Sequence, residues 1–177
     1  MEIELYPSVD IHYGALSILI SPERLAAVLL RNVLEARRFL SLFVSGNYSR
    51  LLSLLNLRDA DFEIRRSFTS SQLLTILEEA HHTFIFFEHD PNLFSEDDDV
   101  IEYVSMALRD LANRSAVLVY SPFLDESMQH IAKKADRLFY LGDISNPRNN
   151  RFHHKARAGR AQSEELIPGA QSTLEVF

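Results

Sequence analysis

The sequence predicts an α/β fold in which a parallel β-sheet carries helices on both faces. Short runs rich in β-branched and aromatic residues alternate with longer segments of helical period. Four of the short runs are nearly continuous hydrophobics, as strands buried on both faces of a sheet should be. A chain of 177 residues that is 46% hydrophobic has the size and composition of one globular domain with a substantial core. The predicted strands cover residues 15–20, 39–45, 62–67, 83–88, 116–121 and 137–141.

The predicted helices lie between these strands, and their starts carry recognisable signals. They follow Pro22, Gly46, Thr69, Ser95 and Asp125 in turn. The first begins at Ser21-Pro22-Glu23, a capping residue followed by proline in the first turn, and runs to about Arg38. The third opens with the capping box of Thr69 and Gln72, and the fourth opens with acidic residues that favour a helix N-terminus. The order of elements is therefore strand then helix, repeated about five times and closing on a strand.

The charge of the chain divides it into two parts. Residues 145–177 hold five basic and three acidic side chains, which leaves 13 basic and 22 acidic side chains for residues 1–144. We expect an acidic α/β domain at 1–144 and a flexible basic tail at 145–177, with little apolar periodicity in the tail. An acidic body is a poor nucleic-acid surface, so DNA or a partner would meet the tail. The basic residues of the tail are Arg148, Arg151, Lys155, Arg157 and Arg160.

The composition also excludes several classes of function. The sequence has no cysteine, which rules out a disulfide scaffold, a zinc ribbon and thiol catalysis. No apolar run approaches the roughly 20 residues that span a bilayer, and no basic region precedes an apolar stretch at the N-terminus. No serine lies in a Gly-x-Ser-x-Gly turn. We expect an intracellular protein, cytoplasmic in an archaeon and nuclear in a eukaryote, and we expect no cofactor.

Two segments carry a family resemblance. Residues 62–94 read as strand, helix and an apolar strand with an acidic end, and residues 99–142 read as a long helix, a strand, a helix with an Ala-Asp pair and a last strand. This layout resembles the core of RecA/RadA recombinases and their paralogues, over about residues 15–143. The resemblance implies a RecA-like fold of the P-loop NTPase type.

The first strand departs from that family at its end. In such ATPases a Gly-x-x-x-x-Gly-Lys-[Ser/Thr] loop (Walker A) follows the first strand, and its N–H groups and lysine surround the phosphates. Here Ser21-Pro22-Glu23-Arg24 follows Ile20, with neither glycine nor lysine. Proline removes an N–H donor, and Glu23 brings a negative charge. The sequence therefore predicts a degenerate ATPase core that does not bind ATP in the ordinary way.

Glu88 ends the fourth strand, where the resemblance implies the magnesium-holding (Walker B) position. Oxygen-rich neighbours follow it, but several ligands must converge to hold a hard cation, so we expect helix capping and a solvated loop rather than a metal site. The neighbours are His89, Asp90, Glu96, Asp97, Asp98 and Asp99. The pairs His81-His82 and His153-His154 are interpreted as surface histidines, because adjacent helical side chains point about 100° apart.

The last seven residues carry a second resemblance. Gln171, Leu174 and Phe177 are spaced by three, so one helical turn brings them close to one face. This pattern resembles the PCNA-interacting peptide (PIP box) of proteins that bind the sliding clamp, although many members have two consecutive aromatics where this chain has one. The resemblance implies that Leu174 and Phe177 fill a clamp pocket while the Gln171 amide bonds to backbone. The alternative is that the segment folds back as a last strand of the domain.

Together these features predict a non-catalytic accessory protein of DNA replication, recombination or repair that binds the sliding clamp (PCNA). A recombinase or a recombinase paralogue is a further possible partner, and DNA contact is expected only through the basic tail. Two alternatives stay open. One is an ATP- or metal-dependent enzyme with a nonstandard site near Glu88 and Asp90, and the other is an obligate recombinase-paralogue subunit whose partner supplies the nucleotide site.

Overall fold

The structure is a computed structural model of the chain. It describes residues 2–6, 9–35, 39–55, 62–94, 98–141 and 173–175. The strands are β1 (Glu2–Tyr6), β2 (Val9–His12), β3 (Leu16–Ile20), β4 (Ser41–Ser45), β5 (Phe62–Arg66), β6 (Phe84–Glu88), β7 (Ala116–Ser121), β8 (Arg137–Tyr140) and β9 (Thr173–Glu175). The helices are α1 (Glu23–Glu35), α2 (Arg50–Leu54), α3 (Ser70–Glu79), α4 (Asp98–Ala112) and α5 (Glu126–Ala132), with a 3₁₀ turn η1 at Pro91–Phe94.

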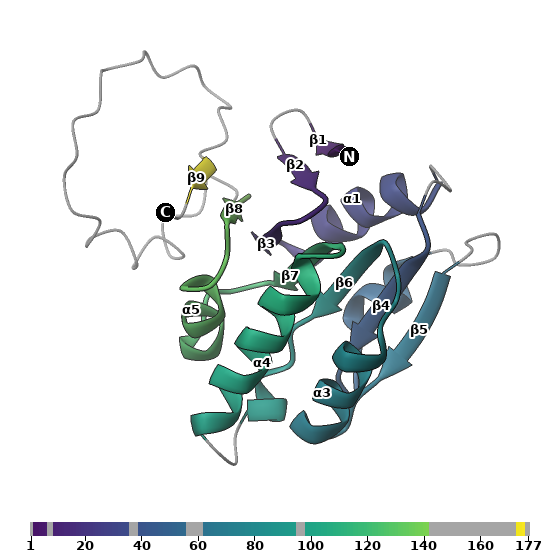
Figure 1. The fold of residues 1–177 in the computed structure, drawn as a ribbon. Coiled ribbons are helices and arrows are strands. Elements are labelled where there is room, and N and C mark those ends of the chain that lie inside the picture. The colour runs from purple at the N-terminus through teal and green to yellow at the C-terminus, as the bar shows by residue number, and fades with distance from the viewer. Residues whose placement is uncertain are drawn as a thin grey trace, which may run out of the picture.

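One sheet organises the domain, with strand order β5-β4-β6-β7-β3-β8-β9 (Figure 1). The six strands from β5 to β8 in this order are parallel, and β9 joins β8 antiparallel. In the middle of the sheet Ile18 of β3 lies between Val119 of β7 and Leu138 of β8. All six predicted core strands are present, so the predicted fold class is confirmed.

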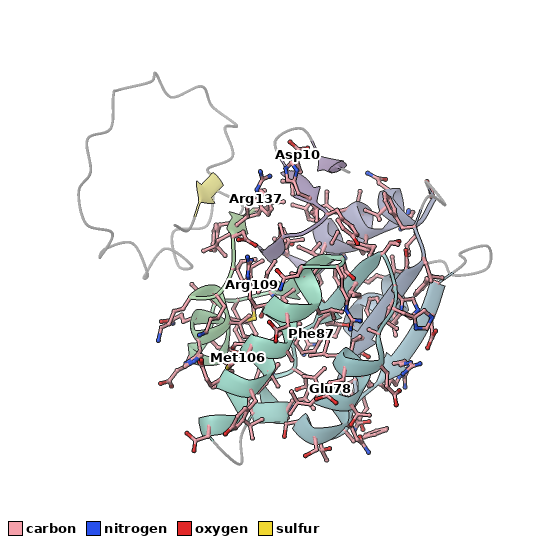
Figure 2. The ribbon with its side chains drawn as sticks, viewed as in Figure 1. Asp10, Glu78, Phe87, Met106, Arg109 and Arg137 are labelled. Atoms are coloured by element: carbon pink, nitrogen blue, oxygen red, sulfur yellow. The ribbon has the colours of Figure 1, made fainter. Side chains whose placement is uncertain are left out.

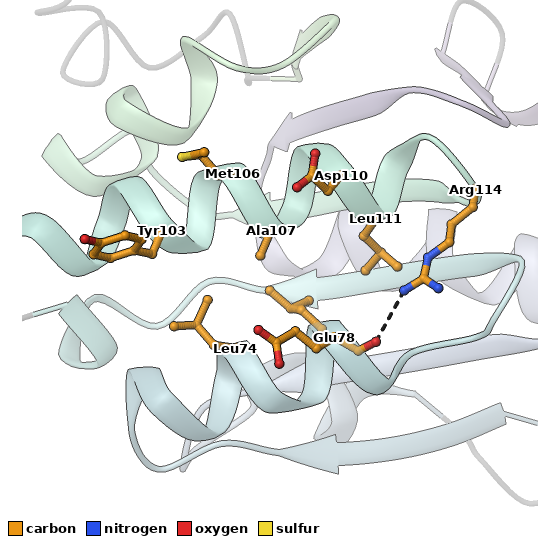
Figure 3. Close-up of a pocket in the computed structure, with 9 residues that line it drawn as sticks. Leu74, Glu78, Tyr103, Met106, Ala107, Asp110, Leu111 and Arg114 are labelled. Atoms are coloured by element: carbon orange, nitrogen blue, oxygen red, sulfur yellow. Dashed lines mark hydrogen bonds between the residues drawn. The ribbon is translucent and has the colours of Figure 1, made fainter.

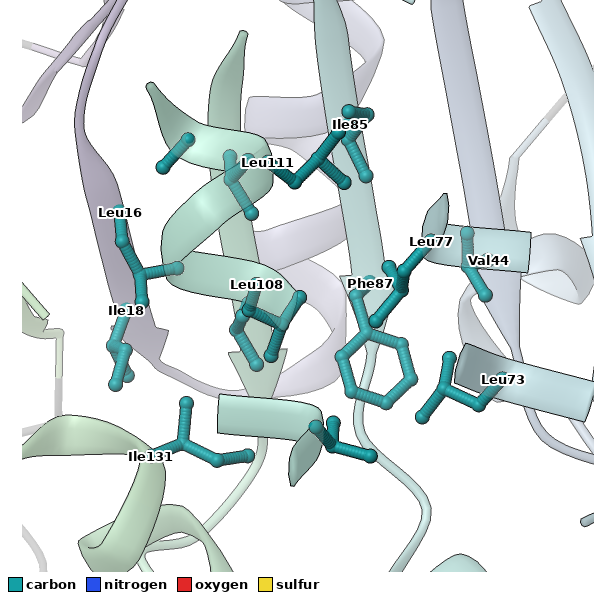
Figure 4. Close-up of a cluster of buried hydrophobic side chains, with 14 of the residues drawn as sticks. Leu16, Ile18, Val44, Leu73, Leu77, Ile85, Phe87, Leu108, Leu111 and Ile131 are labelled. Atoms are coloured by element: carbon teal, nitrogen blue, oxygen red, sulfur yellow. The ribbon is translucent and has the colours of Figure 1, made fainter. Parts of the chain in front are cut away.

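Helices cover both faces of the sheet, and each face has its own core. Alternate residues of a strand point to opposite faces. Thus Phe87 of β6 packs with α3, α4 and α5, in the cluster that Figure 4 shows beside Leu77 and Leu108. Its neighbour Phe86 packs with α1 and α2 on the other face, where its ring stacks on Phe43 at a centroid distance of 5.2 Å. The near-continuous hydrophobicity of the strands is explained by this double burial.

The starts of α3 and α5 follow the sequence signals closely, whereas the prediction that Ser21 caps α1 is wrong, because its buried hydroxyl has no hydrogen-bond partner among the described residues. Thr69 caps α3 by accepting from the N–H of Gln72 at 3.2 Å, and the Gln72 side chain accepts in return from the N–H of Phe68 at 2.8 Å. Asp125 caps α5 by accepting from the N–H of Met128 at 2.7 Å. Each bond satisfies a donor that the first helical turn leaves free.

Two elements lie outside the strand–helix alternation. β1 and β2 form an antiparallel hairpin, which Arg137 of β8 holds by donating to the main-chain oxygen of Asp10 at 3.0 Å (Figure 2). β9 lies beside β8 with Leu174 opposite Leu138. No helix in the part of the chain that the structure describes is both long and apolar enough to cross a membrane.

Candidate functional site at the carboxyl edge of the sheet

The link from β3 to α1 consists of Ser21 and Pro22 alone. Its backbone is held from three sides. The N–H of Ser21 donates to the carbonyl of Ser121 at 3.3 Å, and the buried hydroxyl of Tyr120 donates to the carbonyl of Ser21 at 3.2 Å. The carbonyl of Pro22 accepts from the N–H groups of Leu25 and Ala26. The first turn of α1 therefore begins directly at the end of the strand, and the link offers no ring of free N–H donors to an anion.

The Glu88 carboxylate, at the end of β6, is turned toward the start of α2. It accepts hydrogen bonds from the hydroxyl of Ser49 and from the N–H groups of Arg50 at 3.2 Å and Leu51 at 3.4 Å. Ser49 is itself the N-cap of α2 and accepts from the N–H of Leu52. The predicted Walker B residue thus acts as a second cap of α2, where a negative charge meets the positive end of the helix dipole.

Burial dominates the electrostatics of Glu88. The residue is only 8% exposed, and this desolvation raises the pKa of its carboxyl above the ordinary value, although the bonds from Ser49, Leu51 and Arg50 lower it. The nearby charge of Glu23 raises the pKa further. Glu23 is paired with Arg50 across a 3.0 Å ion pair. Arg50 therefore contacts both carboxylates, Glu23 through its side chain and Glu88 through its main-chain N–H.

His89 and Asp125 form a second polar pair at this edge. The Nε2 of the buried His89 ring lies 2.9 Å from the Oδ2 of Asp125, and the ring stacks on Phe94. Burial raises the pKa of Asp125, but the bonds from His89 and from the N–H of Met128 outweigh it and leave the pKa below its ordinary value. The other ring nitrogen, Nδ1 of His89, is buried without a hydrogen-bond partner among the described residues. The pair joins the end of β6 to the start of α5.

Gly46 and Asp90 meet where β4 and β6 end. A Cβ atom on Gly46 would overlap the side chain of Asp90. Asp90 in turn accepts from the main-chain N–H of Asn92 at 3.0 Å and from its side-chain amide at 2.8 Å, which shapes the turn into η1. Glycine is thus required at position 46, because the Asp90 side chain occupies the space that a Cβ atom would need.

The oxygen-rich stretch after Glu88 does not gather into a metal centre in the described part of the chain. Glu88, His89 and Asp90 point to three different partners, namely α2, Asp125 and Asn92. Among the residues that the structure describes, no group of three His, Asp or Glu side chains is placed to hold a metal ion. Residues 95–97 and the side chain of Asp98 lie outside the described residues, so the structure does not test the interpretation of Glu96, Asp97 and Asp98.

The interpretation of His82 as a surface residue is wrong. His82 is 2% exposed, and its Nε2 lies 3.2 Å from Glu63 on the edge strand β5. Its ring stacks on that of His81, which is exposed, at a centroid distance of 4.8 Å. Desolvation lowers the pKa of His82 despite the Glu63 carboxylate. The apolar strand β6 begins two residues after His82, and this proximity was the available signal for its burial. The pair His153-His154 lies outside the described residues.

Of the predicted clamp-binding residues, the structure describes the backbone of Leu174. It lies in β9 in extended conformation, as the fold-back alternative expects, rather than in a helical turn. Gln171 and Phe177 lie outside the described residues, as does the boundary at 144. The same holds for the five basic residues of the tail, Arg148, Arg151, Lys155, Arg157 and Arg160.

Ser49 was not singled out by the sequence reasoning, and neither was the partnership of Gly46 with Asp90. A signal for Ser49 existed, because serine one residue before an amphipathic segment is a typical N-cap. Nothing in the sequence showed that Glu88, 39 positions later, shares that cap.

Comparison with solved structures places the fold among RecA-like proteins. A KaiC-like protein from the archaeon Pyrococcus horikoshii superposes with a TM-score of 0.55 at 12% identity, covering 75% of this chain and 73% of that one. The RadB recombinase superposes with a TM-score of 0.51 at 12% identity, covering 77% and 78%. At this identity the likeness concerns the fold, and it confirms the RecA-like architecture that the layout of strands and helices predicted.

Sequence comparison finds a nearer relative. No model of a protein family matches the chain. An uncharacterized protein from Archaeoglobus fulgidus is 31% identical over 150 residues, which cover 79% of this chain and 72% of the relative. With its RecA-like domain, the chain therefore belongs to the same family as this uncharacterized archaeal protein.

Proposed function

We propose that the protein is a non-catalytic accessory factor of DNA replication, recombination or repair that binds the sliding clamp (PCNA) through residues 171–177. The observation that carries the non-catalytic role is the two-residue link of Ser21 and Pro22 between β3 and α1. A RecA-like ATPase needs phosphate-binding N–H groups and a lysine at this place. Here the carbonyls and the N–H of the link are engaged within the domain.

The Glu88 carboxylate supports the same role. A magnesium-holding carboxylate must keep its oxygens available to the ion or its waters. Both oxygens of Glu88 instead accept hydrogen bonds from the start of α2, and Glu23 adds negative charge nearby. In this proposal the RecA-like domain binds other proteins and does not hydrolyse nucleotides.

The clamp tether is supported by the spacing of Gln171, Leu174 and Phe177. In a helical turn, Leu174 and Phe177 form an apolar plug for a surface pocket. A buried phenylalanine contributes roughly 2–3 kcal/mol, so a motif with one aromatic binds with a Kd of roughly micromolar order. In the free protein Leu174 pairs with β8, so this segment must leave β8 before it can bind the clamp pocket.

The basic residues upstream of this peptide complete the proposal. Five basic side chains between 148 and 160 give the tail a sign opposite to that of the acidic domain. They steer the protein toward an acidic partner surface or toward the DNA that the clamp encircles. Replacing all five by glutamine should weaken binding to a clamp that is loaded on DNA, and more so at low salt than at high salt. Binding to the peptide pocket of a clamp without DNA should be unchanged.

Isothermal titration with the sliding clamp of the same organism tests the tether. The full chain is compared with the double variant Leu174→Ala, Phe177→Ala, for which we expect at least a tenfold loss of affinity. Val176→Ala is the matched control, because Val176 lies between the anchors and should retain affinity within about threefold. Absence of binding by the full chain, or equal binding by the double variant, overturns the tether.

Calorimetry with ATP and Mg²⁺ tests the non-catalytic role separately. We expect no heat at millimolar nucleotide. Saturable binding that Glu88→Ala abolishes would instead favour an enzyme with a nonstandard site near Glu88 and Asp90. Nucleotide binding that arises only after a recombinase partner is added would favour the obligate-subunit alternative, in which that partner supplies the site.

A further inference from the structure

A groove open to solvent runs between α3 and α4, apart from β9 and from the carboxyl edge of the sheet. It has a volume of about 480 Å³ (Figure 3). Its α4 wall is built from side chains at helical spacing, from Tyr103 through Ala107 to Leu111. Its α3 wall is Leu74, Leu77 and Glu78. Two neighbouring helices thus present a continuous concave surface that no described element of the chain covers.

The groove exposes apolar side chains that a monomer would ordinarily cover. Tyr103 is 61% exposed and Met106 is 50% exposed, and both belong to α4, whose opposite face fills the core. Tyrosine and methionine are enriched at protein interfaces, and methionine adapts its shape to varied partners. Leu77 and Leu111 close the bottom of the groove. The lining is therefore an apolar floor with large side chains along its rim.

Two carboxylates also line the groove, Glu78 from α3 and Asp110 from α4. Neither forms an ion pair with any residue that the structure describes. The one basic lining residue, Arg114, lies at the end of the groove and donates to the main-chain oxygen of Glu78 at 3.3 Å (Figure 3). Figure 3 shows the Glu78 carboxylate on α3 and the Asp110 carboxylate on α4, on the side of that helix away from α3. An occupant would thus meet apolar side chains in the middle and unpaired negative charge on both sides.

We propose that this groove binds an amphipathic helix of a partner protein, with leucine-like residues on its apolar face and lysine or arginine on both flanks. The eight steps from Tyr103 to Leu111 span about 12 Å of α4, which matches about two turns of a partner helix. Apolar anchors at i, i+3, i+4 and i+7 would lie along the floor, and the basic flanks would meet Glu78 and Asp110. This second surface lets the protein hold a partner while residues 171–177 engage the clamp.

Two stapled helical peptides test the proposal. They share leucines at i, i+3, i+4 and i+7, and they carry either lysine or glutamate at both flanks. Fluorescence anisotropy with the full-length protein should show the lysine peptide binding at least about tenfold more tightly than the glutamate peptide. The double variant Tyr103→Ala, Met106→Ala should lower the affinity of the lysine peptide at least about tenfold. The charge reversal Glu78→Lys, Asp110→Lys should make the glutamate peptide the tighter ligand.

Matched controls come from α1, on the other face of the sheet. Val28→Ala changes an equally exposed apolar residue, and Glu35→Lys changes an exposed acidic one, so both should bind the lysine peptide as the natural chain does. Melting curves check that each variant is folded. Equal affinity of the natural chain and the Tyr103, Met106 variant overturns the proposal.

Sedimentation velocity separates this occupant from a second copy of the chain. We expect no self-association that depends on the groove, and a dimer that Met106→Glu dissociates would overturn the proposal. The groove variants should bind the sliding clamp with unchanged affinity. Failure of the groove and failure of the clamp tether are therefore distinguishable.

Discussion

The Glu88 carboxylate at the end of β6 accepts a hydrogen bond from the main-chain N–H of Arg50, in the first turn of α2, at 3.2 Å. Together with the bonds from Ser49 and Leu51, this contact joins β6 to α2, the helix that follows the neighbouring strand β4. The carboxylate that the sequence predicted at the magnesium-holding position therefore has a structural role in this protein. It stabilises a five-residue helix that is too short to be stable by itself.

We expect Glu88→Ala to lower the free energy of unfolding by about 1–3 kcal/mol, because the buried N–H groups of Arg50 and Leu51 lose their acceptor. Urea unfolding at neutral pH measures this loss. The matched control is Glu126→Ala, which removes a carboxylate from the first turn of α5 and should cost well under half as much. An equal effect of the two substitutions would contradict the capping role of Glu88.

The pH dependence of Glu88 has a definite sign. Burial raises its folded-state pKa above 4.5, so the folded protein binds this proton more tightly than the unfolded chain does. The stability due to this group is therefore present below 4.5 and is lost as pH rises through the folded-state pKa. Relative to Glu88→Gln, which cannot ionise, the natural protein should lose free energy of unfolding as pH rises from 4.5 through the folded-state pKa. A constant difference between the two proteins over that range would contradict this assignment.

Gly46→Ala should destabilise the protein by about 1–3 kcal/mol, because the added Cβ overlaps the Asp90 side chain. Removing the obstructing side chain tests the cause directly. In the background of Asp90→Gly, the same Gly46→Ala substitution should cost less than half as much, as thermal unfolding of the four proteins of this double-mutant cycle would show. Gly14 serves as the contrast. Its φ of +86° with open space around it predicts that Gly14→Ala is costly in both backgrounds alike.

Asp125→Ala should cost about 1 kcal/mol at neutral pH through loss of the α5 cap. The pKa of Asp125 is lowered in the folded state, so its contribution is present above the ordinary value of 3.8 and is lost as pH falls through the folded-state pKa. The stability difference between Asp125→Ala and the natural chain should therefore shrink as pH falls from 3.8 through the folded-state pKa. Asp125→Asn retains a capping oxygen and should recover part of the loss at neutral pH. A difference that grows on acidification would contradict the assignment.

The sequence predicted the domain from strand hydrophobicity and helix caps, because both are local signals. Runs such as 84–88 are apolar on both faces of the strand. Thr69 and Asp125 each cap a helix by accepting from an N–H only three residues later. The hairpin of β1 and β2 was not predicted, since its strands are stabilised by contacts with distant elements such as the Arg137 bond to Asp10. These contacts depend on the folded topology, and no periodicity reveals them.

The candidate site was predicted in part for the same reason. The short link of Ser21 and Pro22 after Ile20 is a local feature that the residue types alone reveal. The cap that Glu88 gives to α2, and the groove between α3 and α4, each join segments more than 20 positions apart. Tyr103 and Met106 do carry a signal, because they are apolar residues outside the buried stripe of α4, and such residues are typical of a second contact surface.

If residues 171–177 bind the sliding clamp as proposed, the pairing of Leu174 with Leu138 competes with that binding. The clamp-bound form requires a helical turn, whereas β9 is extended, so only the fraction of molecules with β9 undocked is competent to bind. A synthetic peptide of residues 167–177 has no β8 to pair with. We therefore expect this peptide to bind the clamp about tenfold more tightly than the full chain, which corresponds to a docked state favoured by about 1.4 kcal/mol.

Hydrogen exchange provides the independent measurement for this competition. In the free protein, amides of Thr173–Glu175 and of Arg137–Tyr140 should be protected wherever they bond across the β8–β9 ladder. Saturating clamp should speed exchange on β8, because its outer edge loses its partner, while β3 on the inner side keeps β8 in the sheet. The amides of β4 and β6, which lie far from this edge in the strand order, serve as the internal control and should not change. Unchanged exchange on β8 in the presence of bound clamp would show that β9 stays docked, and the clamp would then have to recognise an extended segment instead of a helical turn.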